Sequence, residues 1–400
     1  MNAIIDRADL RAPDFSQNET AAVVSIGIIA GVIPTLQPIL LGGLLEAGQL
    51  TSEQIGRAGM VEGLGMLLGS FLATVFLPPR SLRPLSMLAL MVMFAANGLT
   101  VSASGNGILL LRGLNGLASG VILWVLVGML TRATSGPRLF AIYVTAQAVM
   151  AALLSWGLSL FLLPQFGIAG GYWLIGTLAL TLLLPAALAL PRAYLPLAGV
   201  RIMLPTALGL AGLIVILCFL AGIMAMWVYF VPLAVGLGHG SKSAGLIVSS
   251  AIAVQIIGGL CAIWAAGRWS GATVTIMSAL GAALAIAAIL FLGAHFAVLV
   301  LATCLISFFW MFAPPSHLPF LLRLDPGGQS AAFISVAQLT GLSVGPLIAS
   351  MAVPSGGAAG AAWVALLILL AGAAIGFALT RFSRPGTAVR VLLSGPSALP

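Results

Sequence analysis

Two charged residues, Glu62 and Arg112, lie inside long apolar segments of this chain. The chain has only 16 basic and 8 acidic residues in 400, and nearly all the others fall between the apolar segments or in the two tails. A charge at bilayer depth costs roughly 2.5–3.5 kcal/mol on insertion scales, so it is rare and is usually paired or functional. A carboxylate at such a position can carry a proton or contact a solute, and a guanidinium can attract an anionic group.

The composition places the chain in a membrane. It is 61% hydrophobic and 6% charged, whereas a soluble domain carries about 25% charged residues. No globular core absorbs this much apolar surface, so the solvent must be lipid, which excludes a soluble enzyme. The formal charge of +8 does not indicate nucleic acid, because no run of four basic residues occurs.

Hydropathy and turn residues predict an all-α membrane protein with twelve spans, since lipid offers no partners for free backbone groups. The expected spans lie near residues 21–45, 54–78, 84–104, 107–131, 139–163, 168–190, 206–236, 243–267, 271–293, 296–320, 329–353 and 358–380. Of the 16 basic residues, 13 fall in the tails or in every second loop. By the positive-inside rule, we expect both termini in the cytoplasm.

The chain also repeats itself weakly. At an offset of 191 residues Ala146-Gln147 recurs as Ala337-Gln338, and at 189 residues two glycines recur, Gly56 and Gly69 as Gly245 and Gly258. These matches predict two pseudo-symmetric six-helix bundles. We expect a cytoplasmic tail at 1–20, bundles at 21–190 and 206–381, a cytoplasmic linker at 191–205 and a second tail at 382–400.

Topology gives the two buried charges a common depth. Both helices enter from the outer side, and Glu62 lies about eight residues in, roughly 12 Å deep at about 1.5 Å per residue. We expect Glu62 to face the bundle with Gly59, and a pair with Arg112 would lower the cost of both charges. Two alternatives stay open: a carboxylate that water reaches at the outer mouth, and an ion pair that only fixes two helices.

Several uncharged side chains inside the spans are candidates for contact with a solute. An amide facing lipid is expensive, so each Gln faces protein or water, as solute contact or as a bond between helices. Trp and Tyr near span ends can instead belong to interfacial belts. The candidates are Gln37, Asn115, Ser119, Tyr143, Gln147, Trp227, Tyr229, Gln255, Trp310 and Gln338.

The tenth span contains prolines, and we expect it to bend and to act as a gate. Pro314, Pro315 and Pro319 interrupt its hydrogen bonds, and His317 lies between them. His317 titrates near neutral pH when hydrated, and a plain hydrated histidine near the cytoplasmic end is the alternative. The three cysteines fit no metal spacing, and no nucleotide loop or nucleophile constellation is present, so we expect no cofactor, no metal and no enzyme activity.

The segment Leu109–Gly120, in which Arg112 is followed by Gly116 and Gly120, resembles the fourth-helix motif of the major facilitator superfamily. The segment Leu50–Gly56 is also similar, and within the superfamily the chain most resembles bacterial arabinose-efflux-permease-like proteins. The loop after the second span departs from the family pattern, with Pro78-Pro79 where acid and base are expected. The fifth span also lacks the Gly-Pro motif of many drug–proton antiporters.

The resemblance and the residues together predict a secondary active transporter of the bacterial inner membrane. We expect alternating access, a small amphiphilic organic solute and protons as partners, a monomeric state, and efflux rather than uptake. Glu62 and Arg112 would couple transport to protons. Two alternatives are proton-coupled uptake of an organic or aromatic acid, and a non-transporting membrane sensor on the same scaffold.

Overall fold

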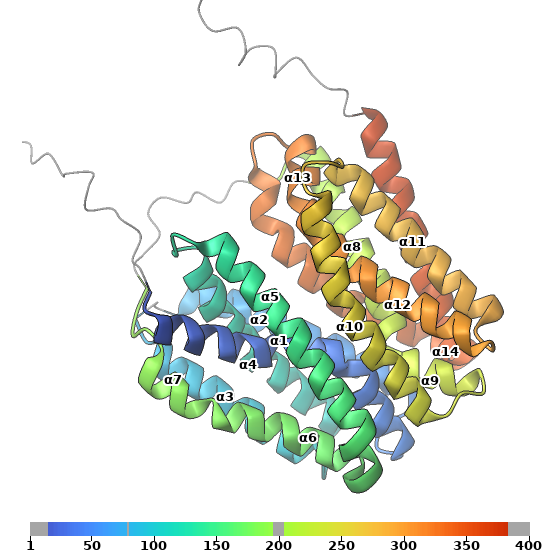
Figure 1. The fold of residues 1–400 in the computed structure, drawn as a ribbon, viewed down its shortest axis with the longest axis horizontal. Coiled ribbons are helices and arrows are strands. Elements are labelled where there is room, and N and C mark those ends of the chain that lie inside the picture. The colour runs from blue at the N-terminus through green and yellow to red at the C-terminus, as the bar shows by residue number, and fades with distance from the viewer. Residues whose placement is uncertain (1–14, 78–79, 195–203, 383–400) are drawn as a thin grey trace, which may run out of the picture.

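The computed structural model describes residues 15–77, 80–194 and 204–382. Within them the chain is helical (Figure 1). The helices are α1 Gln17–Glu46, α2 Ser52–Phe76, α3 Leu82–Thr100, α4 Asn106–Leu130, α5 Gly136–Gly157, the π-helix η2 Leu158–Leu162, α6 Leu163–Thr181, α7 Leu183–Ala189, α8 Ala207–Val228, α9 Phe230–Gly236, α10 Ser241–Ala265, α11 Gly271–Leu292, α12 Phe296–Phe312, α13 Pro314–Leu324, the 3-10 helix η3 Gln329–Phe333 and α14 Ile334–Phe382.

Among the described residues, nine helical segments are long and apolar enough to cross a membrane, or ten with the bent α12–α13 pair. Two of them, Arg138–Ala189 and Gln329–Arg381, have 52 and 53 residues. A straight helix of that length would extend about 78 Å, far beyond a hydrocarbon core of about 30 Å. Each reverses at a glycine with positive φ, Gly167 and Gly357, and so supplies two spans. The twelve expected spans are confirmed.

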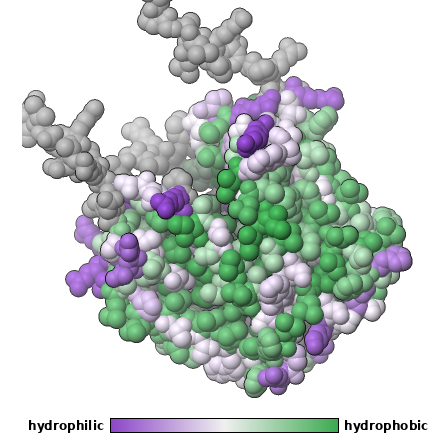
Figure 2. All heavy atoms as spheres, viewed as in Figure 1, coloured by the Kyte–Doolittle hydropathy of each residue, from purple (hydrophilic) through white to green (hydrophobic). Residues whose placement is uncertain are grey.

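The helices form two groups that lie side by side, α1–α7 and α8–α14 (Figure 1). Because the number of spans is even, α1 begins and α14 ends at the same membrane face, which we name the terminal face. The other face, where α1 ends at Glu46, is the opposite face. On the side seen in Figure 2 the middle of the bundle is mostly apolar, and hydrophilic side chains gather at its margins.

Local sequence signals explain where several spans begin. Ser16 and Glu19 form a capping box at the start of α1, and Thr51 and Gln54 form another at the start of α2. These side chains satisfy backbone N–H groups that have no partner inside the helix. The capped ends fix the register of α2, and with it the depth of Glu62.

Glycines allow α2 and α4 to approach until their backbones touch. A Cβ at Gly116 would overlap the carbonyl oxygen of Glu62, and a Cβ at Gly69 would overlap that of Leu117. Only a residue without a side chain fits at such positions, as in other membrane helix pairs. The close contact places the side chains of Glu62 and Arg112 on adjoining helices at one depth.

The prolines of the tenth span bend it as the sequence predicts. α12 ends at Phe312, α13 begins at Pro314, and the two axes differ by 50°. Proline has no N–H to donate and clashes with the preceding turn, so the helix breaks there. The gating role of Pro314 and Pro315 stays a prediction.

The loop after α13 is held by a carboxylate. The backbone N–H of Ser330 donates to Asp325 Oδ2 at 2.8 Å, and the Ser330 hydroxyl donates to the same oxygen. The Ser330 hydroxyl lowers the pKa of Asp325 below its usual value, and the backbone groups of Ser330 and Thr206 act in the same direction. Asp325 therefore stays ionised and anchors this corner at the terminal face.

The α2–α4 contact gives a stability prediction with a matched control. Gly116→Ala should destabilise the fold by about 1–3 kcal/mol, because the added methyl forces the two backbones apart. Gly113→Ala, one turn away on α4, should have little effect, since its Cβ would lie 3.8 Å from the nearest atom, the carbonyl oxygen of Val61. Thermal unfolding of the purified variants in detergent measures both effects, and equal midpoints would contradict the close packing.

Candidate transport site

Glu62 and Arg112 form an ion pair in the interior of the first helix group. Arg112 Nη1 lies 3.4 Å from Glu62 Oε1, and the two side chains are 1% and 2% exposed. Asn115 Nδ2 donates to the same Oε1 at 2.8 Å, and Gln37 Nε2 donates to Oε2 at 3.0 Å. The carboxylate therefore accepts from α4 and α1, so three helices meet at Glu62.

The guanidinium of Arg112 is bound mainly by α3. Its Nη2 donates to Thr100 Oγ1 at 2.8 Å and to the Ala96 carbonyl at 3.3 Å, and its Nη1 donates to Asn97 Oδ1 at 3.1 Å. The guanidinium carbon also lies 4.8 Å from the ring centroid of Tyr172 in α6. Hydrogen bonds to a planar guanidinium and a cation–π contact lower the cost of burying this charge.

The two alternatives for Glu62 have different outcomes. The interpretation as a hydrated carboxylate is wrong for this structure, because the residue is 1% exposed and bonded on both oxygens. Pairing with Arg112 is confirmed by the geometry. The role of the pair in coupling stays a prediction.

Some buried polar atoms around the pair have no hydrogen-bond partner among the described residues. They are Gln37 Oε1, Arg112 Nε, Ser119 Oγ and the Tyr172 hydroxyl. A buried donor or acceptor left unpaired costs about 1–3 kcal/mol. These atoms offer hydrogen bonds to water or to a solute polar group that reaches the network.

The network contains three residues that sequence reasoning missed, Asn97, Thr100 and Tyr172. Asn97 had a usable signal: it is an amide inside the apolar span near 84–104, and the argument applied to the glutamines also applies to it. Thr100 and Tyr172 carry no such signal. Their role follows only from how α3 and α6 are rotated against α4.

Two candidate residues join the helix groups instead of lying in an interfacial belt. Trp227 Nε1 donates to the Thr35 carbonyl at 3.1 Å, and the Tyr229 hydroxyl accepts from the Gly56 N–H at 2.9 Å. Trp227 is 1% exposed and Tyr229 is fully buried, so the belt interpretation is wrong for both. Trp310, which is partly exposed, meets Trp227 edge to face with centroids 5.5 Å apart.

Two further hydrogen bonds link the groups near the opposite face. The hydroxyls of Ser155 and Ser249 lie 2.7 Å apart, and Ser241 Oγ donates to Glu46 Oε1 at 3.1 Å. Together with the bonds of Trp227 and Tyr229, they form a set of four hydrogen bonds between described residues of the two groups. All of them lie in the half of the bundle toward the opposite face.

The remaining candidates bond to neighbouring helices within their own group. Gln147 Nε2 donates to the Gly31 carbonyl at 2.9 Å. The Tyr143 hydroxyl packs against the same glycine, so closely that a Cβ at Gly31 would overlap it. Gln255 Nε2 donates to Ser307 Oγ at 3.5 Å. These contacts of Tyr143, Gln147 and Gln255 do not involve the Glu62–Arg112 pair. Their contact with a solute stays a prediction.

His317 is buried, which corrects the expectation of a hydrated histidine. Its exposed fraction is 0%, its Nδ1 lies 3.2 Å from Gln338 Nε2, and its ring meets Phe219 with centroids 5.8 Å apart. The bend before α13 turns this part of the span inward against α8 and α14, so nearness to a membrane face does not bring the ring to water.

Solved structures with the same arrangement are transporters, although the sequence itself matches no family model and no curated protein. The nucleoside transporter NupG aligns with a TM-score of 0.71 and 14% identity over 91% of this chain and 100% of its own. A D-xylose-proton symporter aligns with 0.66 and 13% identity over 92% and 99%. A bacterial homologue of the human lysosomal transporter Spinster aligns with 0.65 and 14% over 93% and 98%.

These likenesses show the fold. The chain has the major facilitator superfamily fold, as the Arg112 motif implied. It is an all-α membrane protein of twelve spans in two pseudo-symmetric six-helix bundles. The narrower likeness to arabinose-efflux-permease-like proteins stays a prediction.

The ion pair predicts an asymmetric set of stability changes. Arg112→Leu should destabilise the fold by about 3–5 kcal/mol, because it leaves the Glu62 carboxylate buried without its counter-charge. Glu62→Gln alone should cost less, since Arg112 keeps its contacts with α3 and Tyr172. Glu62→Gln should restore part of the stability lost in Arg112→Leu. Thermal unfolding of the four proteins forms a double-mutant cycle, and additive effects would show that the two side chains do not interact.

Proposed function

We propose that this protein is a secondary active transporter that moves a small amphiphilic organic solute by alternating access, driven by protons. The moving units are the bundles 21–190 and 206–381, which rock against each other. The observation that carries the proposal is the buried Glu62–Arg112 network, which reaches α1 beside the intergroup contacts. The transporter folds of the similar solved structures support the same class.

The surroundings of Glu62 support proton coupling. The ionised carboxylate accepts from Gln37, Asn115 and Arg112. Protonation removes its charge and converts one oxygen from an acceptor to a donor, so these three donors lose their charge-assisted partner. A proton therefore shifts the balance between two packings of α1, α2 and α4, which is the differential interaction that a coupled transporter requires.

The intergroup hydrogen bonds support a state that is closed at the opposite face. Gly56, Thr35, Ser155 and Glu46 all contact the second group there. The excess of basic residues in the terminal-face loops supports a cytoplasmic location for both termini in a bacterial inner membrane. With that orientation, the solute site would be reached from the cytoplasm in this state, which fits efflux by exchange for protons.

The candidate solute contacts combine aromatic and amide side chains. Trp227, Trp310 and Tyr143 are aromatic, while Gln147 and Gln338 supply amides, which together suit an amphiphilic molecule. Arg112 is a poor primary site for an organic acid, because Glu62 and three oxygen acceptors of α3 already bind its guanidinium. Uptake of an anionic solute is therefore less well supported than exchange of a neutral or cationic one.

Glu62→Gln tests the coupling. The solute is first found by thermal shift against amphiphilic organic compounds, because a ligand of the native state raises apparent stability. In proteoliposomes the variant should lose solute accumulation driven by a pH gradient, yet keep solute exchange at equal pH on both sides. Glu53→Gln is the control, since Glu53 lies on the same helix but is exposed and paired with Arg57. Undiminished gradient-driven accumulation would refute the role of Glu62, and absence of any solute flux in the wild type would favour a sensor.

Ser155 and Ser249 allow a test of the closed face. Cysteines at both positions, in a chain whose three native cysteines are replaced, should form a disulfide under oxidation and lock the two groups together. Transport should stop on oxidation and return on reduction, whereas each single-cysteine variant should be insensitive. A cross-linked protein that still transports at the wild-type rate would show that the groups do not separate at this face.

A further inference from the structure

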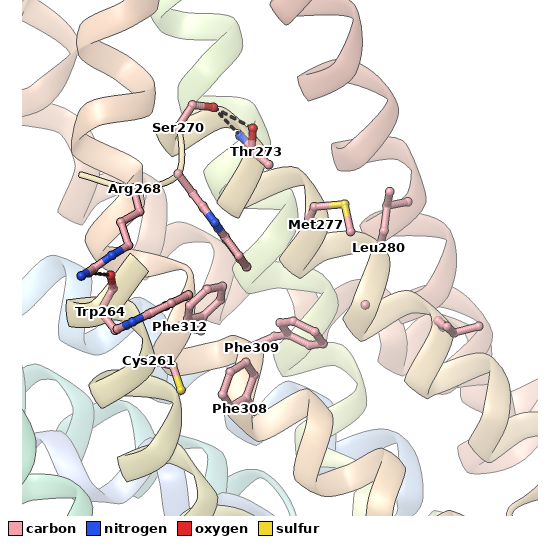
Figure 3. Close-up of a pocket in the computed structure, with 13 residues that line it drawn as sticks. Cys261, Trp264, Arg268, Ser270, Thr273, Met277, Leu280, Phe308, Phe309 and Phe312 are labelled. Carbon is pink, nitrogen blue, oxygen red and sulfur yellow. Dashed lines mark hydrogen bonds between the residues drawn. The ribbon is translucent and has the colours of Figure 1, made fainter. Parts of the chain in front are cut away.

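A large apolar pocket lies in the second helix group, away from the Glu62–Arg112 pair. It has a volume of about 900 Å³ and lies between α10, α11 and α12, within the range of about 300–1,000 Å³ typical of small-molecule sites. Figure 3 shows Trp264 and Arg268 on one side, Met277 and Leu280 on the other, and Phe312 between them. Nothing in the proposed transport cycle uses this pocket.

The pocket extends inward from a membrane boundary. Arg268 lies in the loop between the end of α10 at Ala265 and the start of α11 at Gly271, at the terminal face. The lining of the pocket continues along α11 to Leu284, thirteen residues beyond Gly271, or about 20 Å deeper at about 1.5 Å per residue. One leaflet of hydrocarbon is about 15 Å thick, half of a core of about 30 Å. The pocket therefore spans at least the depth of one lipid leaflet.

The lining is open toward lipid and apolar along its length. Trp264, Met277 and Leu284 are 55%, 57% and 73% exposed, so these side chains face the surroundings of the bundle. Trp264 and Trp269 meet edge to face with centroids 5.9 Å apart at the boundary. Tryptophans at this level pack against lipid near the headgroups. An extended alkyl chain matches the shape and chemistry of this space.

The rim carries an exposed positive charge. Arg268 donates to the Trp264 carbonyl and lies over the Trp264 ring, with 5.1 Å from its guanidinium carbon to the centroid. Among the described residues it has no acidic partner, since their two ion pairs are Arg57–Glu53 and Arg112–Glu62. A guanidinium has five N–H donors, so most remain available to a phosphate group.

We propose that this pocket is a binding site for an anionic phospholipid. An acyl chain occupies the space between α10, α11 and α12, and the phosphate accepts hydrogen bonds from Arg268. Arg268 at the rim matches the phosphate, and the two tryptophans at the boundary match the headgroup region. The apolar wall below them matches an acyl chain. The proposal concerns the bilayer and does not depend on the solute, the coupling ion or the direction of transport.

The test uses the full chain in nanodiscs of phosphatidylcholine with a minor fraction of phosphatidylglycerol carrying the same acyl chains. Native mass spectrometry of the released protein counts the lipids that stay bound. Wild type should retain phosphatidylglycerol preferentially, and Arg268→Gln should reduce this preference about fivefold. Arg381→Gln is the matched control, because Arg381 also stacks on an aromatic ring, that of Phe377, at the end of α14 but lines no part of the pocket.

A second pair of variants tests the acyl-chain part of the site. Leu280→Trp fills the pocket and should lower retention of both lipids, whereas Leu367→Trp, at an exposed position of α14 outside the pocket, should not. Equal loss of preference in Arg268→Gln and Arg381→Gln would overturn the site in favour of a diffuse basic surface. Unchanged retention in Leu280→Trp, with unfolding midpoints like wild type, would overturn occupation of the pocket by a chain.

Discussion

The burial of one ion pair in a lipid environment is the constraint on which the first helix group depends. Both Glu62 and Arg112 are buried, and an isolated charge at this depth would be expelled or neutralised. Both are kept because α1 and α3 add amide, hydroxyl and carbonyl partners and α6 adds an aromatic face. Five of the first six spans therefore contribute to one polar centre, which makes their relative positions interdependent.

Close backbone contact makes this centre possible. Gly116 and Gly120 of α4 lie against the carbonyl oxygens of Glu62 and Met66. The second group has a similar backbone contact, in which Gly345 of α14 lies against the carbonyl oxygen of Ala221 in α8. Without a hydrophobic force between helices in lipid, such contacts and polar bonds supply the association. The glycines thus set the helix separation at which a 3.4 Å ion pair can form.

Sequence reasoning succeeded where the property depends on depth along the membrane normal, and it failed where the property depends on rotation about a helix axis. The twelve spans, the bend before Pro314 and the common depth of Glu62 and Arg112 follow from hydropathy, proline chemistry and the rise of a helix. The partners Thr100 and Tyr172 do not, because their contribution requires knowing which faces of α3 and α6 meet α4. The burial of His317 was missed for the same reason, since a residue near a membrane face can still point into the bundle.

The two helix groups are alike in shape but not in chemistry, and this asymmetry bears on the proposed proton coupling. At the repeat offset of 189 residues the position of Glu62 corresponds to Ala251, and at 191 residues that of Arg112 corresponds to Thr303. Both are buried, and the Thr303 hydroxyl donates to the Leu299 carbonyl of its own helix. In the proposed coupling, a proton on Glu62 changes the charge at a position where the second group has an alanine. Because Gln37 bonds Glu62 and lies on α1, whose Thr35 carbonyl binds Trp227, that change acts two residues from the contact between the groups. In the proposed cycle, the first group therefore repacks against an uncharged side chain of the second group, that of Trp227.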